Sequence, residues 1–416
     1  MDTAKPFDIS KQQVWKAYKA VRANAGAAGV DEETIADFEK NLKGNLYKIW
    51  NRLASGSYFP PPVRAVAIPK KNGGERILGV PTVADRVAQT VAKQYLEPIL
   101  EPIFLTDSYG YRPQKSALDA IAITRERCWR YDWILEFDIK GMFDNIGHAL
   151  LLKALEKHTT CKWVTLYIKR WLTAPLQQED GNLVERTQGT PQGGVVSPAL
   201  SNLFMHYTFD VWMKRMFPGS PWCRYADDGL VHCKTEEEAK AVKLALQSRL
   251  AACGLEMHPD KTQIVYCKDS NRKGSYPNTK FDFLGYEFRA RGAKVRARGT
   301  LFTSFAPAVS AKSLKAMRAR TRQLNLRNQT HLSLAEFARI LNPILRGWIA
   351  YYGKFYPSAM SPVYRHTDYT IRAWIMRKHK RLRRRKIRAS MLLRRIAEQN
   401  PSLFAHWRFG GIGAFV

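Results

Sequence analysis

The apolar positions change their spacing twice along the chain. Helical spacing, in which apolar residues return every three or four positions, covers residues 11–22 and 32–48. From Val63 onward, short strands with alternating apolar residues mix with helices. In this part we expect helices over 83–100 and 235–253, a hairpin around Asp180-Gly181, and an aromatic strand over 281–288 with Gly285 as a point of close approach. Beyond Pro307 the pattern is helical alone. The chain is therefore predicted to be an α/β protein with an all-helical C-terminal region, whose helices cover 310–325, 333–356, opened by a capping box at Ser333, and a stretch starting at 362.

One predicted strand pair carries two adjacent acids at its tip. Apolar residues lie on both sides of Asp227 and Asp228, and Gly229 follows them, which predicts a β-hairpin. Neighbouring like charges repel, and a cation with a preference for hard oxygen ligands, such as Mg²⁺, would relieve that repulsion. A solvated turn is the plainer interpretation, since Asp and Gly are ordinary turn residues.

A third carboxylate favours the metal-binding interpretation. Strand alternation over 133–139 puts Trp133 and its apolar partners on one face and Glu136 and Asp138 on the other. Asp138 ends this strand on the polar side. Phe143 lies five residues further on, where a phenylalanine is more often a core residue than a functional one.

Three further segments carry residues suited to phosphates and leaving groups. A hairpin around Asn72-Gly73 holds Lys70, Lys71 and Arg76, which are either solvated or a clamp for a triphosphate. A Gly- and Pro-rich turn that opens a helix contains Gln192, and such a turn lets backbone N–H groups approach a ligand. Lys261 is expected to be exposed on the turn 254–262.

Composition and charge favour a nucleic-acid partner. The 416 residues allow two or three domains with real cores, and the net charge is +31. The stretch 301–416 holds 23 Lys and Arg against 3 acidic residues. Since no apolar run is long enough to span a bilayer, a membrane is the weaker candidate. The six cysteines lack C-x-x-C pairs, and the N-terminus lacks a secretory pattern, so we expect reduced thiols and a cytoplasmic location.

The strongest charge run, Lys378 to Arg388, has aromatic residues around it. A charge run is usually a solvated face. Rings interleaved with arginines instead favour a nucleic-acid surface, with Arg and Lys on phosphates and the rings stacking on bases. The rings considered for this role are Tyr369, Trp374, Phe404, Trp407 and Phe409.

In order and wording, these segments resemble a reverse transcriptase, and more closely a bacterial group II intron reverse transcriptase, or maturase. The resemblance extends over nearly the whole chain. It rests on N-A-G-A-A-G-V-D (24–31), I-P-K-K-N-G-G-E-R-I-L-G-V-P (68–81), S-Y-G-Y-R-P (108–113), F-D-I-K-G-M-F-D (137–144), G-T-P-Q-G-G-V-V-S-P (189–198), Y-A-D-D (225–228), G-L-E-M-H-P-D-K-T (254–262), F-L-G-Y-E-F (283–288) and L-R-G-W-I-A-Y-Y-G (345–353).

The resemblance implies an α/β right-hand polymerase, with fingers, a palm built on an antiparallel sheet, and an all-α thumb. Its implied domains are an N-terminal extension over 1–62, fingers and palm over 63–305, a three-helix thumb over 306–386, and a basic C-terminal tail over 387–416.

Residue roles also follow from the resemblance alone. It makes Asp138, Asp227 and Asp228 the ligands of two Mg²⁺ ions, with Mn²⁺ as a possible substitute, and Lys261 the general acid. The incoming nucleotide would be bound by Lys70, Arg76 and Gln192, with Phe143 excluding ribonucleotides. The implied primer grip is Phe283, Leu284 and Gly285, and the implied nucleic-acid contacts of the basic run are Arg383, Arg384, Arg385 and Lys386.

The implied activity is RNA-directed DNA synthesis by two-metal phosphoryl transfer. Its partners would be group II intron RNA, an RNA template with a DNA primer, dNTPs and a DNA target. Two alternatives remain open: a maturase that binds intron RNA and only assists splicing, and a domesticated reverse transcriptase in DNA repair or phage defence.

One departure from the family pattern concerns the C-terminus. Many members end in a zinc-binding H-N-H endonuclease, whereas no cysteine pair follows Trp407 here. A protein of this kind is expected to take its primer from elsewhere, such as a replication fork or a nicked target.

Overall fold

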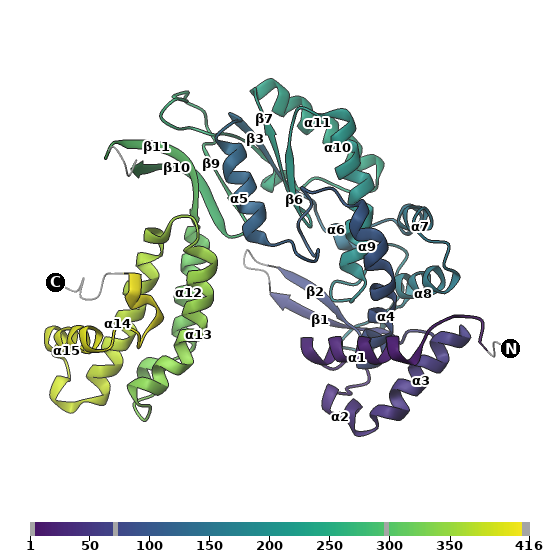
Figure 1. The fold of residues 1–416 in the computed structure, drawn as a ribbon, viewed down its shortest axis with the longest axis horizontal. Helices are drawn as coiled ribbons and strands as arrows, with labels where there is room; N and C mark the ends of the chain where they lie inside the picture. The colour runs from purple at the N-terminus through teal and green to yellow at the C-terminus, as the bar shows by residue number, and fades with distance from the viewer. Residues whose placement is uncertain (1–4, 70–73, 295–298, 410–416) are drawn as a thin grey trace. The chain divides into compact units, whose positions relative to one another are not determined.

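The computed structural model describes residues 5–69, 74–294 and 299–409. The chain divides into two compact units. The first comprises Met1–Ala120 and Leu135–Ile264, and the second comprises Ile121–Ile134 and Val265–Val416. The elements are mixed α/β and end in a run of helices, as the sequence predicts (Figure 1).

The first unit opens with three helices. Helix α1 (Lys11–Asn24) starts at a capping box in which Ser10 and Gln13 bond each other's backbone N–H. The single helix predicted over 32–48 is wrong, because it is two helices, α2 (Ile35–Lys40) and α3 (Leu42–Ser55). The break lies at Asn41, whose φ of −127° and ψ of 47° are not helical.

A small sheet of the first unit has the strand order β2-β1-β4-β5. Strands β1 (Val63–Pro69) and β2 (Glu75–Val80) form the predicted antiparallel hairpin, with Ile68 opposite Arg76. The turn between them, which carries Lys70 and Lys71, lies outside the described residues. Strands β4 (Leu176–Gln177) and β5 (Leu183–Val184) form a second hairpin around Gly181, also as predicted.

A four-stranded sheet, in the order β6-β7-β3-β8, holds the acidic segments. Its strands are β6 (Trp222–Tyr225), β7 (Asp228–Cys233), β3 (Trp133–Asp138) and β8 (Gln263–Tyr266). In β3 the apolar face was expected to be buried and the other face polar, but Ile134 and Asp138 are buried too. Only Glu136 is half-buried, so both faces of the strand are covered.

Further helices surround these strands. The predicted helices over 83–100 and 235–253 are confirmed as α4 (Val83–Leu100) and α11 (Glu236–Ala252). A π-helical segment, His206–Asp210, joins α9 (Ser197–Met205) to α10 (Val211–Met216). The remaining helices are α5 (Ala117–Cys128), α6 (Met142–Asn145), α7 (His148–Glu156) and α8 (Lys162–Thr173).

The second unit contains a sheet in the order β11-β10-β9. The single aromatic strand predicted over 281–288 is wrong, because Leu284 and Gly285 turn the chain with φ of 50° and 82°. They join β9 (Lys280–Phe283) to β10 (Tyr286–Lys294) as a hairpin. Strand β11 (Leu301–Val309) pairs with β10 and passes Pro307, where the helical region was expected to begin.

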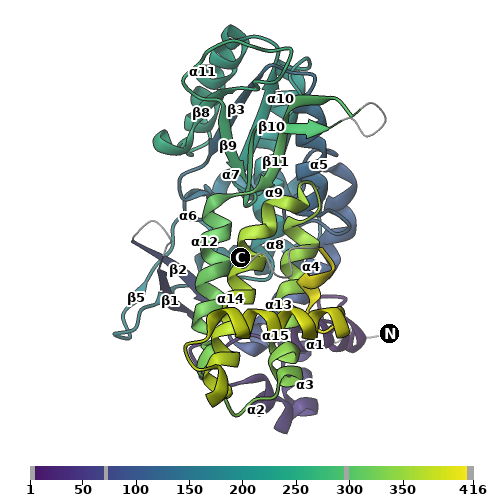
Figure 2. The same cartoon turned by 90° about the vertical axis from the view of Figure 1, so that its left-hand side faces the viewer.

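Within the described residues, four α-helices follow β11. Those expected from the sequence are α12 (Ala311–Gln323), α13 (Leu334–Tyr352), which starts at the predicted Ser333 capping box, and α14 (Ser361–Lys378). The fourth is α15 (Lys386–Gln399), which crosses α14 in Figure 2. The resemblance predicts a basic tail from residue 387. A helix forms instead because Ala389, Leu393 and Ala397, four positions apart, are buried in the same core as Phe337.

That core also takes three rings that the sequence suggested for stacking on bases. Trp374, Phe404 and Trp407 are buried, so this expectation is wrong for them, while Tyr369 and Phe409 are exposed. All six cysteines are free thiols and five are buried, as predicted. None of the described helices combines the length and the apolar character needed to cross a membrane.

Candidate active site

The two adjacent acids lie at the tip of a hairpin, as their flanking residues predict. Tyr225 pairs with Asp228, so Ala226 and Asp227 form the turn between β6 and β7. Ala226 has a φ of 59°, an uncommon conformation for a residue other than glycine. Asp227 is half-buried and Asp228 is exposed at the start of β7.

Asp138 ends the neighbouring strand β3 and is buried. Its carboxylate accepts a hydrogen bond from Lys261 Nζ in an ion pair. Lys261 belongs to the short 3₁₀ turn Pro259–Lys261. Backbone bonds tie this segment to β3, since His258 N–H donates to the Asp138 carbonyl at 2.8 Å. The sequence predicted an exposed Lys261, and its side chain is indeed 56% exposed.

The three carboxylates influence one another electrostatically. Desolvation raises the pKa of Asp227, and the Asp138 charge raises it further. Although Asp228 is exposed, the protein around its carboxyl group and the charges of Asp227 and Asp138 raise its pKa to about 7. Burial opposes the Lys261 cation, but the hydrogen bond and charge of Asp138 outweigh it and raise the pKa of Lys261. The site therefore gathers negative charge that one lysine only partly balances.

In the described part of the chain, no three His, Cys, Asp or Glu side chains form a group that could hold a metal ion as they stand. The Asp138 carboxylate is paired with Lys261 instead. The donor chemistry nevertheless fits Mg²⁺, because carboxylate oxygens are its preferred ligands, and burial together with the neighbouring acidic charges raises the pKa of Asp227 and of Asp228. A divalent cation would compete with Lys261 for Asp138.

Gln192 links three segments of the first unit. Its Nε2 donates to the two carboxylate oxygens of Asp144 at 3.2 and 3.1 Å. Its Oε1 accepts a hydrogen bond from Arg76 Nε. Its carbonyl accepts from Gly79 N–H at 2.8 Å. The structure thus brings Arg76 and Gln192 together, and it gives Asp144, whose role the sequence left open, the task of orienting the Gln192 amide.

A buried amide, which sequence reasoning missed, anchors the same turn. Gln89 Oε1 accepts from Val195 N–H at 2.7 Å and from Val196 N–H at 3.3 Å. Gln89 Nε2 donates at 2.9 Å to Asp85, and both residues are 1% exposed. The sequence does contain a sign of this buried amide, because two polar residues four positions apart interrupt the apolar pattern of the helix over 83–100.

Phe143 is buried at the start of α6. Its carbonyl accepts from Thr190 N–H at 2.7 Å, which joins it to the segment before Gln192. The ring meets Tyr111 edge-on, with centroids 6.2 Å apart. Phe143 therefore belongs to the same cluster of segments as Gln192.

Two regions of this chain match the models of known protein families. Residues 68–288 match the family described as "Reverse transcriptase (RNA-dependent DNA polymerase)", and residues 314–392 match "Group II intron, maturase-specific domain". The chain is 30% identical over 320 residues to Protein YkfC of Escherichia coli, which covers 67% of this chain and 80% of YkfC. The chain belongs to the group II intron reverse transcriptase and maturase family.

Two further proteins are similar to this chain. Group II intron-encoded protein LtrA of Lactococcus lactis is 35% identical over 193 residues, 46% of this chain and 32% of LtrA. A solved telomerase of Candida albicans covers 90% of this chain at 14% identity, with a TM-score of 0.44. This reverse transcriptase and maturase chain thus spans most of YkfC and about a third of LtrA.

The expected primer-grip residues of the reverse transcriptase lie in the second unit. Phe283 is buried at the end of β9. The Leu284 carbonyl accepts from Tyr351 Oη at 2.8 Å. A Cβ at Gly285 would come within 3.0 Å of the Tyr352 hydroxyl, which agrees with the close approach expected at this glycine. Helix α13 thereby holds the turn between β9 and β10.

The basic residues expected to bind nucleic acid lie between α14 and the first residue of α15, within the stretch matched to the maturase domain. We call Arg383, Arg384, Arg385 and Lys386 the basic connector. All four residues are exposed. Their charges are thus available to phosphates.

Proposed function

We propose that this chain copies group II intron RNA into cDNA as an RNA-directed DNA polymerase and binds that RNA to assist splicing and mobility. The observation that carries the proposal is the set of three carboxylates, Asp138, Asp227 and Asp228, coupled to one another and to Lys261 within a reverse transcriptase domain. A protein that only binds RNA has no need to hold such repelling charges together.

In this proposal Asp138, Asp227 and Asp228 hold two Mg²⁺ ions, for which Mn²⁺ can substitute. Such a pair of ions, when bound, stabilises both the attacking and the leaving oxygen of an in-line phosphoryl transfer. Lys261, once released from Asp138, is left with a proton on Nζ and serves as the acid for the leaving pyrophosphate. The amine keeps this proton without Asp138, because the ordinary pKa of a lysine lies well above neutral pH.

The remaining roles concern the nucleotide, the primer and the RNA. Arg76 and Lys70 bind the triphosphate, and Gln192 lines the nucleotide and template pocket. The hydrogen bond between Arg76 and Gln192 supports placing both at one substrate. Phe283, Leu284 and Gly285 support the primer, while the basic connector binds RNA or the DNA target through phosphates.

Primer extension on an RNA template tests the proposal directly. We expect the protein to extend an annealed DNA primer with dNTPs in Mg²⁺ or Mn²⁺, and to stop when EDTA removes the metal. Filter binding of the same RNA in EDTA serves as the control for protein quality. RNA binding without any extension, in either metal, would contradict polymerase activity.

The match to the maturase-specific domain favours a second function, assistance to intron splicing. A group II intron RNA incubated with the protein without dNTPs isolates this function. Faster splicing with an inactive polymerase site would support a maturase role that is independent of DNA synthesis.

Phe143 gives a prediction about sugar discrimination. We expect Phe143→Val to raise incorporation of ribonucleotides relative to deoxyribonucleotides on the order of 10- to 100-fold, because a smaller side chain leaves room for a 2′-hydroxyl. The measurement is kcat/KM for dCTP and CTP on one template. Phe59→Val is the matched control, since this ring is 68% exposed in the same unit. An unchanged ratio would make Phe143 a packing residue only.

A further inference from the structure

A fully buried ion pair lies directly behind the acidic turn. Arg224 and Asp210 are both 0% exposed. Arg224 Nε donates to Asp210 Oδ1 and Nη2 donates to Oδ2, each at 2.7 Å. Arg224 is on β6, two residues before Ala226, and Asp210 closes the π-helical segment His206–Asp210. Single-turn π-helical segments of this kind occur frequently at functional sites.

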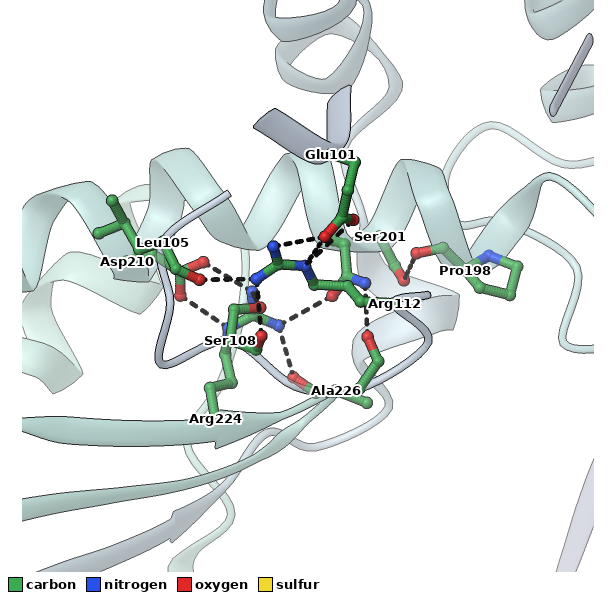
Figure 3. Close-up of polar contacts among 11 residues, drawn as sticks. Glu101, Leu105, Ser108, Arg112, Pro198, Ser201, Asp210, Arg224 and Ala226 are labelled. Carbon is green, nitrogen blue, oxygen red and sulfur yellow. Dashed lines mark hydrogen bonds and ion pairs between the residues drawn. The ribbon is translucent and has the colours of Figure 1, made fainter. Parts of the chain in front are cut away.

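Every N–H of the Arg224 guanidinium has an acceptor. Besides the two bonds to Asp210, Nη1 donates to Asn202 Oδ1 and to the Ala226 carbonyl, both at 3.1 Å. The remaining Nη2 hydrogen goes to Ser108 Oγ at 2.8 Å. Figure 3 shows Arg224 between Asp210, Ser108 and Ala226. Since a guanidinium has five N–H groups in a rigid plane, this set of acceptors fixes its orientation.

One of those acceptors belongs to the acidic turn itself. The Ala226 carbonyl is the peptide oxygen directly before Asp227, and Ala226 holds the uncommon φ of 59°. A non-glycine residue stays in such a conformation only where its surroundings impose it. The bond from Arg224 Nη1 is one such constraint.

The loop over 108–113 supplies further constraints. A Cβ at Gly110 would lie 2.5 Å from the Ala226 nitrogen, so this loop packs directly on the turn. Asn202 Nδ2 donates to the Gly110 carbonyl at 2.7 Å, while its Oδ1 holds Arg224. The loop backbone also bonds that of Arg224, from Tyr109 N–H to its carbonyl at 2.9 Å. The turn is thus enclosed by groups that Arg224 organises.

Stability alone is a weak explanation for this pair. Removing two charges from water costs several kcal/mol per ion, and replacing a buried ion pair by apolar residues is often neutral or stabilising. A buried ion pair can instead serve to orient the groups around it.

We propose that the Arg224–Asp210 pair fixes the position of the Ala226 carbonyl, and through it the spacing at which Asp227 and Asp228 bind divalent cations. This inference rests on the proposed polymerase function, in which those acids hold the metal ions. Arg224 and Asp210 act through the turn and do not themselves touch the metal or the nucleotide. Sequence reasoning missed both, because Asp210 lies in a helical segment with no motif around it.

The test uses Arg224→Lys and Asp210→Asn in the full chain. Lysine keeps the charge beside Asp210 but cannot supply the planar set of donors. We expect kcat for primer extension to fall about 100-fold, because a shift of the acidic turn by about 1 Å costs roughly that factor. The KM for dNTP and the RNA affinity should stay within about twofold of the wild-type values. We also expect Mn²⁺ affinity, measured by electron paramagnetic resonance without substrate, to weaken about tenfold.

Asp368→Asn is the matched control for loss of a buried charge. Asp368 accepts from His406 Nε2 at 2.8 Å and is equally inaccessible, but it lies in the second unit. If Arg224→Lys fails to fold, Ser108→Ala removes a single acceptor and should give a smaller drop in kcat and Mn²⁺ affinity. Wild-type Mn²⁺ affinity in folded variants, or losses equal to those of Asp368→Asn, would overturn the inference. Mn²⁺ binding is measured without catalysis, so the two proposals fail in different ways. If the polymerase proposal is wrong, the wild-type protein will bind Mn²⁺ but will not extend primers.

Discussion

Replacing Asp227 with alanine is expected to lower RNA-templated primer extension by at least about 10³-fold. The change removes one of three carboxylates that we assign to two Mg²⁺ ions. Metal ions contribute several kcal/mol of transition-state stabilisation, and each 1.36 kcal/mol corresponds to a factor of ten in rate. Single-turnover extension of one nucleotide measures the chemical step without interference from product release.

The same variant should fold normally and keep its RNA affinity. Asp227 is half-buried in a two-residue turn, and burial together with the neighbouring Asp138 charge raises its pKa, which means that its own charge is disfavoured there. Removing it relieves repulsion, so the free energy of unfolding should stay equal or increase slightly. Thermal unfolding and filter binding check these two expectations.

Glu237→Ala provides the matched control for loss of a carboxylate. Glu237 is exposed in the first turn of α11 and lies in the same unit. It should extend primers at the wild-type rate. If Asp227→Ala lost RNA binding together with synthesis, misfolding would be the explanation, and the assignment of the site would be wrong.

The elements that the sequence predicts well are those whose ends carry local signals. The bounds of α4 match the expected 83–100, and Thr82 caps its first turn. The hairpin tip at Asp227 and Asp228 is equally local, because a glycine and two apolar flanks define it. In each case residues adjacent in sequence are enough to predict the element, although distant groups then hold the turn at Ala226 in place.

The sequence-based predictions are wrong where residues distant in sequence determine the local structure. The turn at Leu284-Gly285 interrupts an unbroken aromatic pattern, since Tyr351 and Tyr352 of α13 hold it in place. Helix α15 was mistaken for a tail because its arginines obscure three small or apolar residues that complete a core. Trp374 and Trp407 fill that core as well, although next to a charge run they resembled a stacking surface.

The candidate site shows the same division. The motif residues could be named from the sequence, and the structure places Asp138 beside Lys261 and Arg76 beside Gln192. The groups that hold them could not be named, because Gln89 reaches its partners across more than one hundred residues. Contacts of this kind depend on the assembled fold and leave only weak traces in a single sequence.

Replacing the residues of the basic connector is expected to have the second large effect, a loss of RNA affinity. We expect replacement of all four residues by glutamine to weaken RNA affinity by 10- to 1,000-fold at about 0.2 M salt, because each lost phosphate contact forfeits counterion release. The plot of log K against log salt should become shallower by about 0.7 to 0.9 per contact, and so by about 2.8 to 3.6 if all four residues contact phosphates. Equilibrium binding of intron RNA between about 0.05 and 0.3 M salt measures both quantities. The residues replaced are Arg383, Arg384, Arg385 and Lys386.

A control of equal charge change separates local contacts from the general attraction of a chain with net charge +31. Four exposed basic residues of the first unit serve, because they lie far from the basic connector in sequence and belong to the other compact unit. If both quadruple variants weaken binding and flatten its salt dependence equally, the connector is a solvated face that adds only to the overall field. If the connector variant loses more RNA affinity and salt dependence than the control variant, the connector contacts phosphates. The connector variant should then still extend primers at the wild-type single-turnover rate when the template is saturating. The control positions are Lys214, Arg215, Lys234 and Lys240.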